Sequence, residues 1–132
     1  MEKPPPKTEL MSYLLKLEEL AELLLGIYLF TLLDYSWWIF PALILLPDIG
    51  MVGYLFNLKT GAWLYNLFHH KAIAITCYFI GLWLAMPVLK LVGIIIFSHA
   101  ALDRIFGYGL KYSDSFKHTH LGWLGNKTSV HE

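Results

Sequence analysis

Four hydrophobic segments follow one another along the chain, and short polar breaks separate them. The segments are Met11–Leu33, Trp37–Phe56, Gly61–Met86 and Val88–Phe106. Each is close to the length of about 20 residues that a helix needs to cross about 30 Å of hydrocarbon. The pattern predicts an all-α fold, namely an integral membrane bundle of about four transmembrane helices.

The breaks between these segments carry residues typical of turns. They are Asp34–Ser36, Asn57–Gly61 and Met86–Pro87. Such short connections favour antiparallel neighbours, so we expect an up-and-down bundle. Within the second segment, Pro47 has no amide proton to donate, and we expect it to kink that helix.

Two further regions flank the hydrophobic segments. Residues 1–10 contain three consecutive prolines and are expected to form a disordered cytoplasmic lead before the transmembrane domain at residues 11–106. Residues 107–132 are polar, but they are too rich in aromatic residues and leucine for solvated disorder. We expect them to form a short cytoplasmic cap and tail on the helix ends.

Composition favours lipid over water as the solvent of this chain. Hydrophobic residues make up 57% of the sequence and charged residues only 15%, whereas soluble domains carry about 25% charged residues. The formal net charge is zero and the sequence has no basic block, which argues against a nucleic-acid groove. Cys77 is the only cysteine, so the chain can form neither an internal disulfide nor a cysteine-based metal site.

Positive charges give the predicted bundle an orientation. They gather in the N-terminal lead, in the second turn and in the tail, at Lys3, Lys7, Lys59, Arg104, Lys111, Lys117 and Lys127. Four spans would place these three regions on one side of the membrane. Because basic residues accumulate on the cytoplasmic side, both termini are expected in the cytoplasm.

Ionisable side chains interrupt the apolar segments at comparable depth on that same side. At about 1.5 Å per residue, Glu18, Asp48, His69 and His99 lie about 10–13 Å from the cytoplasmic helix ends, and Asp103 about 5 Å. His99 and Asp103 are four residues apart and therefore share one helix face. An uncompensated aspartate inside a span costs about 3 kcal/mol, so these groups need one another, water or a cation.

This combination of side chains predicts a divalent transition metal. Carboxylates and imidazoles suit Zn, Mn or Fe rather than Ca or Mg. The expected metal ligands are Asp48, His69, His99 and Asp103. Water bound to such a metal has a pKa near 7 and can act as the nucleophile of a hydrolase. Glu18 is the candidate general base.

Further polar residues accompany the predicted metal site. Arg104 is a second candidate catalytic residue, because its guanidinium can grip a substrate phosphate through two hydrogen bonds; it could equally reach toward lipid headgroups. Lys111 could join it in recognising an anion. The candidates for a second shell or a lid are Asn66, Glu22, Lys111 and His120.

Several functions are compatible with these residues. The first is a metal-dependent hydrolase that acts on a lipid or other amphiphile. The second is a non-enzymatic membrane protein: a proton or metal-ion pathway, a small transporter or an accessory subunit, since paired Asp and His residues also suit a proton relay. A di-iron oxidase is a third, although such enzymes carry many more histidines. In each case Asp–His pairing could instead simply hold the helices together, and a homodimer is plausible because four helices bury little surface.

The stretches LLPDIGMVGY, GAWLYNLFHH and FSHAALDRIFGYGLKYSDSFKHTHLG resemble a small bacterial membrane family known as domain of unknown function 4260. The resemblance covers the chain from about Tyr13 to Gly125, and it implies a location in the bacterial inner membrane. Its polar signature positions correspond to Glu18, Asp48, Asn66, His69, His99, Asp103, Arg104, Lys111 and His120. The family pattern does not favour His70 or His118 as site residues. A weaker similarity, of pattern only, links the Pro47-Asp48 pair to membrane-bound metal-dependent hydrolases, without the second acidic residue and adjoining histidine of those proteins.

Overall fold

The computed structural model describes residues 9–111, 113 and 117–123. Residues 1–8 of the expected lead and 124–132 of the expected tail lie outside this part. The elements, in chain order, are α1 (Glu9–Thr31), α2 (Ile39–Leu43), the 3₁₀-helix η1 (Leu46–Leu55), α3 (Leu58–Phe68), α4 (Lys71–Trp83), α5 (Pro87–Ile105), β1 (His118–Thr119) and β2 (Gly122–Trp123). The prediction of an all-α fold is confirmed, with β1 and β2 forming only a two-residue antiparallel pairing beside the helices.

The described part contains five α-helices and one 3₁₀-helix rather than four helices, because the second and third hydrophobic segments are each broken. In the second segment, α2 ends before Pro47, and a 3₁₀-helix follows in which that proline occupies one of the first two positions. The amide of Asp48 donates to the carbonyl of Leu45, three residues back. The proline therefore starts a new helix of different type instead of kinking a continuous one.

The third segment is broken at His69 and His70, where the sequence pattern shows no turn residue. The His69 ring nitrogen Nδ1 lies 2.7 Å from the carbonyl oxygen of Tyr65, which in a continuous helix accepts from the His69 amide. That amide bonds instead to the carbonyl of Asn66, and His70 takes an extended conformation before α4 begins. The imidazole thus replaces a backbone donor and helps to end α3.

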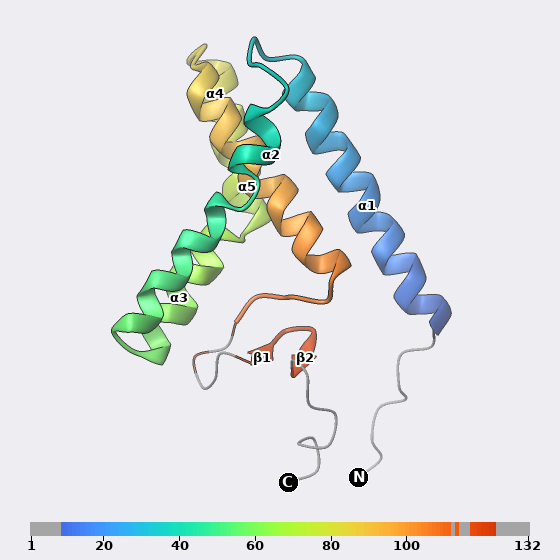
Figure 1. Ribbon diagram of the computed structural model, residues 1–132, viewed down its shortest axis with the longest axis vertical. Coiled ribbons are helices and arrows are strands. Elements are labelled where there is room, and N and C mark those ends of the chain that lie inside the picture. Colours follow the sequence, from blue (N-terminus) through green and yellow to red (C-terminus); the bar gives the residue numbers. More distant parts are fainter. Residues whose placement is uncertain (1–8, 112, 114–116, 124–132) are drawn as a thin grey trace, which may run out of the picture.

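Helix α5 is the centre of the molecule. Its residues from Gly93 to Ala101 are all buried, and it packs against α4 on one side and α1 on another (Figure 1). Glycines permit this close approach: a Cβ on Gly26 would lie 2.0 Å from Ser98 Oγ, and one on Gly93 would lie 2.5 Å from the carbonyl oxygen of Ala74. Small residues at helix crossings are typical of helices that pack in lipid.

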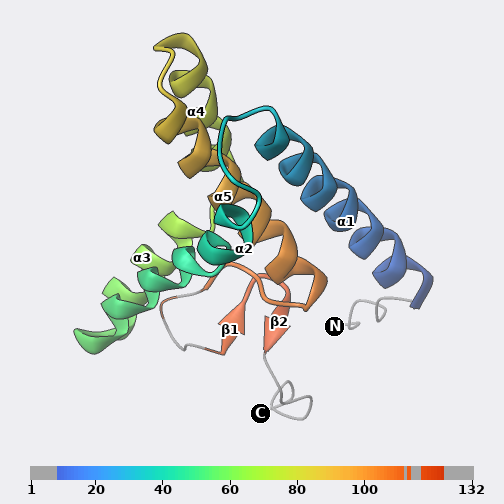
Figure 2. The ribbon, with the colours of Figure 1, turned by 45° about the horizontal axis from the view of Figure 1, so that its top comes forward.

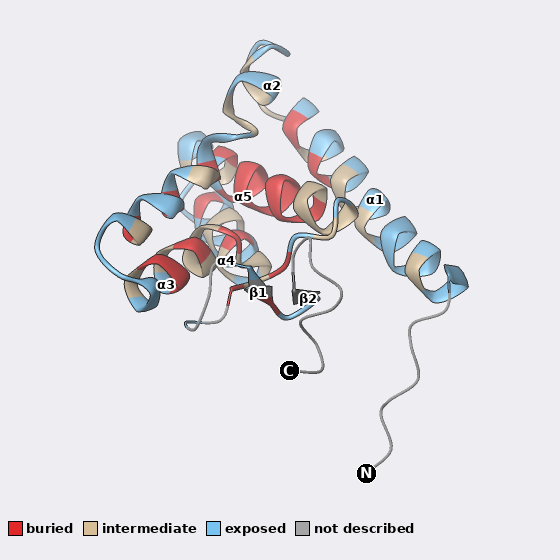
Figure 3. Ribbon diagram, turned by 60° about the horizontal axis from the view of Figure 1, so that its bottom comes forward, coloured by how far each residue is buried: buried red, intermediate tan, exposed pale blue. Residues whose placement is uncertain are grey.

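The helices do not form one up-and-down bundle. Helix α3 pairs with η1, and this pair leaves the group of α1, α4 and α5 at an angle (Figure 2). Burial is concentrated on α5 and on the inner face of α3, whereas α1 exposes most of its surface (Figure 3). The expected bundle is wrong in this respect, because breaking two segments produced short helices that turn away from the others. In the described part of the chain, no helix is both long enough and apolar enough to cross a membrane.

Candidate metal centre

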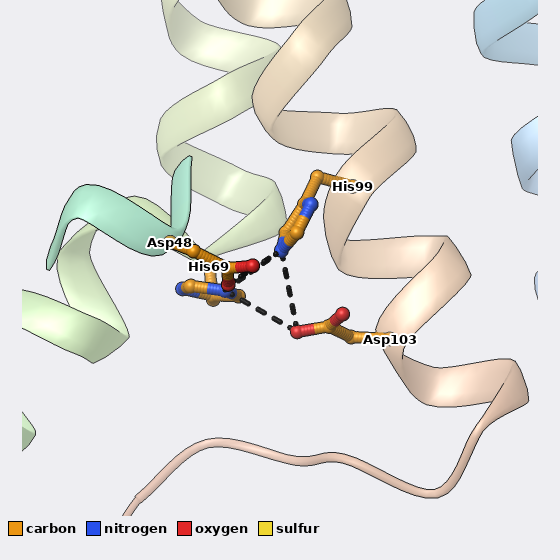
Figure 4. Close-up of side chains that lie close together, drawn as sticks. All are labelled: Asp48, His69, His99 and Asp103. Atoms are coloured by element: carbon orange, nitrogen blue, oxygen red, sulfur yellow. Dashed lines mark hydrogen bonds and ion pairs between the residues drawn. The ribbon is translucent and has the colours of Figure 1, made fainter. Parts of the chain in front are cut away.

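Four side chains from three different segments converge on one point (Figure 4). Asp48 comes from η1, His69 from the end of α3, and His99 and Asp103 from successive turns of α5. One ligand atom from each lies within 4.8 Å of the other three. These are the four residues that the sequence predicts as metal ligands, and together they are called the His/Asp cluster below.

Distances within the His/Asp cluster match those of a small coordination shell. His69 Nε2 lies 3.2 Å from Asp48 Oδ1 and 3.3 Å from Asp103 Oδ2. For His99 Nε2 the same distances are 3.1 and 3.4 Å, and the two Nε2 atoms are 3.0 Å apart. Four ligands placed about 2.0 Å from a tetrahedral metal are separated by about 3.3 Å. Five of the cluster's contacts therefore have the length that a shared metal would impose.

Both imidazoles direct the same nitrogen into the cluster because the other is held by the backbone. His69 Nδ1 lies 2.7 Å from the carbonyl oxygen of Tyr65, and His99 Nδ1 lies 2.5 Å from that of Ile44. A carbonyl only accepts, so each Nδ1 carries the proton and donates it. In a neutral imidazole the Nε2 atom is then a lone-pair donor. This is the arrangement that a metal-binding histidine usually shows.

The broken second segment supplies one of those carbonyls. In a continuous helix the Ile44 carbonyl would accept from the amide of Asp48, but that amide turns to Leu45. The Ile44 oxygen is then available to the His99 ring, which lies fifty-five residues further along the chain. The same local break therefore presents Asp48 to the cluster and orients His99.

These observations leave acceptor atoms facing one another. With both Nδ1 atoms protonated, two neutral imidazoles and two carboxylates bring four lone-pair atoms together with no hydrogen between them. A cation in their midst satisfies all four, and two carboxylates would neutralise a divalent ion. Alternatively, one imidazole could be protonated and donate to a carboxylate, which is the Asp–His pairing that could hold the helices together. The two Nε2 atoms are 3.0 Å apart, so they leave no room for protons on both.

The cluster is closed on most sides and open beside Asp48. The side chains of His99 and His69 are 1% and 3% exposed, and that of Asp103 is 16% exposed. The Asp48 side chain is 42% exposed. A bound ion would therefore be shielded by the histidines and reachable past Asp48.

Tyr65 supports the cluster and was missed in the sequence. Its ring stacks on that of His69, with centroids 3.8 Å apart and planes inclined by 10°, and its hydroxyl donates to Asp103 Oδ2 at 3.2 Å. One side chain thus orients two of the four candidate ligands. The signal that could have revealed it is spacing, because Tyr65 stands four residues before His69 on the same helix face.

Asn66 and Lys111, two candidate second-shell residues, join the C-terminal segment to α3. The Asn66 side chain accepts from the Lys111 amide at 2.6 Å and donates to the Lys111 carbonyl at 2.8 Å. This holds the Lys111 ammonium 4.9 Å from the centre of the Tyr65 ring, where the side chain is buried. Burial lowers the pKa of Lys111, and the nearby Asp103 carboxylate opposes that shift. Lys111 therefore lies behind the His/Asp cluster, against Tyr65.

Arg104 and His120 lie beside the cluster, at a separate polar cavity. The Arg104 guanidinium donates to the His69 carbonyl at 3.4 Å, so it braces a candidate ligand through the backbone. It also lines a cavity of about 450 Å³ together with Glu19 and His120. His120 Nδ1 accepts from the Leu110 amide at 2.8 Å, which ties that ring to the chain leading out of α5 and away from the cluster.

The acidic residues of α1 are arranged differently from the expectation. Glu18, the candidate base, is exposed and is not part of the cluster. Glu22 lies 3.2 Å from the ammonium of Lys71, which also binds Glu19. Glu19 and Glu22, rather than Glu18, therefore face the rest of the molecule. Lys71 begins α4, so this ion-paired trio fastens α1 to the junction that follows His69.

The fold and the cluster define a class: a small all-α protein with a buried site of two histidines and two carboxylates. The family model described as "Domain of unknown function (DUF4260)" matches residues 12–124. The chain therefore belongs to this family, as its sequence resemblance indicated. A search of curated proteins found no match, and a search of solved structures found none either.

Proposed function

We propose that this protein is a metal-dependent hydrolase of the membrane, with its metal held by the His/Asp cluster and with a lipid or other amphiphile as substrate. One observation carries the proposal: four potential ligand atoms lie within 4.8 Å of one another while both histidine Nδ1 atoms are committed to backbone carbonyls. Nitrogen and oxygen ligands of this kind favour Zn, Mn or Fe. Such an ion would supply an acidified water, with a pKa near 7, as the nucleophile.

The protein's own residues would divide the remaining work. His69 and His99 are buried and braced by carbonyls, and the half-buried Asp103 is braced by Tyr65, so these three suit the permanent ligands. Asp48 stands on the open side, where substrate would enter and where its carboxylate could take the proton of the attacking water. Asp48 replaces Glu18 in this role, because Glu18 is exposed on α1 outside the cluster.

The proposed membrane location rests on the surface of the molecule. Large apolar side chains are exposed on the four longer α-helices and just before α2, among them Leu17, Leu24, Trp37, Trp63, Phe79, Trp83 and Val88. Soluble monomers rarely expose apolar patches beyond a few hundred Å², and lipid is the partner that this surface suits. The start of α1, the end of α5 and the β1–β2 pair lie toward one side of the molecule, the lower side in Figure 1. That is the side we assign to the cytoplasm of a bacterial inner membrane, with lipids as neighbours.

The test replaces the metal with Co²⁺, whose visible spectrum reports coordination. Wild-type protein in detergent should bind one Co²⁺ with the intense bands of a low-coordinate site, and azide should shift these bands, because a hydrolase keeps a position open for water. Asp48→Asn should weaken binding, whereas Glu18→Gln on the exposed face of α1 is the matched control and should bind as wild type does.

Each outcome of that test separates the alternatives. If azide does not shift the cobalt bands, the metal site is closed and structural, which would contradict the hydrolase proposal. Absence of binding would contradict any metal centre and favour the second candidate, a proton pathway through paired Asp and His residues. Proton flux in proteoliposomes, abolished by Asp48→Asn, would then support that candidate.

A further inference from the structure

An apolar groove of about 350 Å³ runs along α5 beside the His/Asp cluster. Its lining contains no charged or hydrogen-bonding side chain; it consists of Leu43, Leu46, Pro47, Ile49, Phe68, Val88, Leu91, Val92, Ile95 and Ile96. Such a surface offers water no hydrogen bond, whereas a hydrocarbon chain that fits the groove contacts apolar side chains on several sides. The groove therefore suits a hydrocarbon ligand.

The walls of the groove come from the segments that hold the candidate ligands. Pro47 and Ile49 stand on either side of Asp48, and Phe68 directly precedes His69. Ile95 and Ile96 lie one turn before His99 on α5. The cluster is open beside Asp48, whose side chain is 42% exposed. The short stretch of η1 around Asp48 therefore contributes both to the wall of the groove and to the open side of the cluster.

The dimensions of the groove favour a single chain over a protein partner. A partner helix of ordinary length, about 11 residues or about 17 Å, would extend well beyond the groove. From Ile96 to Val88 the groove follows α5 over eight residues, or about 12 Å. A long and narrow space of this size accommodates one alkyl chain.

We propose that this groove binds the hydrocarbon chain of a single-chain amphiphile whose polar head reaches the metal past Asp48. The inference rests on the proposed metal site and adds the substrate class: a fatty-acid derivative, a lysolipid or another molecule with one alkyl tail. The chain lies along α5 from Ile96 toward Val88, and the bond to be hydrolysed lies between chain and head.

The test uses straight-chain alkyl hydroxamates as probes, because the hydroxamate head binds divalent metals and its tail can be lengthened stepwise. Affinity is read from the cobalt spectrum of the full-length protein in lipid nanodiscs. Wild-type affinity, expressed relative to the probe already dissolved in the lipid, should rise with chain length while methylenes enter the groove, by less than the about fourfold per methylene of transfer from water, and then level off. Val92→Trp should abolish most of this rise, since Val92 lies in the groove and is 40% exposed, which lets the indole fill the groove without disturbing the core.

Two matched variants make the test specific. Val88→Trp lies in the same groove, four residues further from His99 than Val92→Trp. The affinity of this variant should therefore level off at a probe chain about 6 Å longer than in Val92→Trp. Leu24→Trp, on the exposed face of α1, should behave as wild type does and controls for the added tryptophan; nanodiscs without protein give the partition of each probe into lipid.

The results distinguish failure of the groove from failure of the metal site. If Co²⁺ binds but affinity rises equally in wild type and Val92→Trp, the groove proposal is overturned and the metal proposal stands. If wild-type protein binds no Co²⁺, both are overturned. A plateau that is the same in Val88→Trp and Val92→Trp contradicts the proposed course of the chain along α5.

Discussion

The chemistry of this protein depends on how two histidine rings are held. His69 and His99 stand thirty residues apart in the sequence, yet each gives its Nδ1 proton to a carbonyl that a helix break has freed. The sequence predicted all four members of the cluster, because residue type and depth are visible in it. It could not show which carbonyl would fix each ring, since that depends on where helices end.

Tyr65 offers a test of this support. Tyr65→Phe keeps the ring that stacks on His69 but removes the hydroxyl that donates to Asp103. Loss of an outer hydrogen bond to a ligand typically weakens metal binding 10–100-fold, so we expect the metal to be retained with a dissociation constant raised by about that factor. Titration against a competing chelator measures it.

The control for this prediction is Tyr28→Phe, which removes a hydroxyl from an exposed tyrosine of α1. It should leave metal affinity unchanged. Unchanged affinity in Tyr65→Phe as well would mean that Asp103 needs no support from this hydroxyl.

The acidic residues of α1 show where residue-level prediction stops. Glu18, Glu19 and Glu22 differ only in their angle around one helix, and the sequence does not say which angle faces the rest of the molecule. The structure turns Glu19 and Glu22 toward Lys71 and leaves Glu18 exposed. Lys71 cannot be recognised from the sequence as the partner of these glutamates, because its position depends on where α4 begins.

At the scale of elements, the interruptions of the hydrophobic segments matter more than the segments themselves. The existence of helical structure in all four segments was predicted, but both internal breaks fall inside segments that mean hydropathy presents as continuous. The break after His69 depends on a side chain that competes for a backbone carbonyl. Hydrophobic periodicity carries no information about such competition, which explains why the predicted bundle was too regular.

The crossing of α4 and α5 provides a second prediction. A methyl group on Gly93 would approach the Ala74 carbonyl oxygen to 2.5 Å and the Tyr78 amide nitrogen to 2.7 Å, and backbone atoms cannot move aside. Gly93→Ala should therefore force the helices apart and lower the free energy of unfolding by about 1–3 kcal/mol, although alanine is the better helix former. Denaturing-detergent titration measures the change.

The neighbouring exposed position gives the comparison for this variant. Val92→Ala, on the same helix but 40% exposed in wild type, should change the free energy of unfolding by less than about 1 kcal/mol. A Gly93→Ala protein as stable as wild type would show that α4 and α5 are not tightly apposed.

At the scale of the whole molecule, the proposed location follows from an apolar exterior around a polar cluster. A core of this size leaves most leucine and tryptophan side chains of the helices at the surface, and the His/Asp cluster lies within the interior instead. Lipid would cover the exposed apolar side chains and leave the His/Asp cluster reachable only through the opening beside Asp48. The arrangement would let an amphiphile approach from the membrane and meet the metal with its polar end.

Membrane association can be tested without knowing the substrate. Cells that produce the protein should retain it in the membrane fraction after a wash with alkaline carbonate, which removes proteins held only by charge, and detergent should release it. Recovery of folded protein in the carbonate supernatant would contradict the proposed location.

The central claim, that the His/Asp cluster holds a metal, is tested most directly by elemental analysis of protein purified without chelator. Wild-type protein and the exposed-face variant Glu18→Ala should each contain one transition-metal ion per chain. His99→Ala and Asp103→Ala should remain folded by circular dichroism but contain less than about a tenth of that metal, as expected when a ligand is lost. Wild-type protein that is folded and free of metal after growth with Zn, Mn and Fe, or equal metal in His99→Ala, would contradict the account.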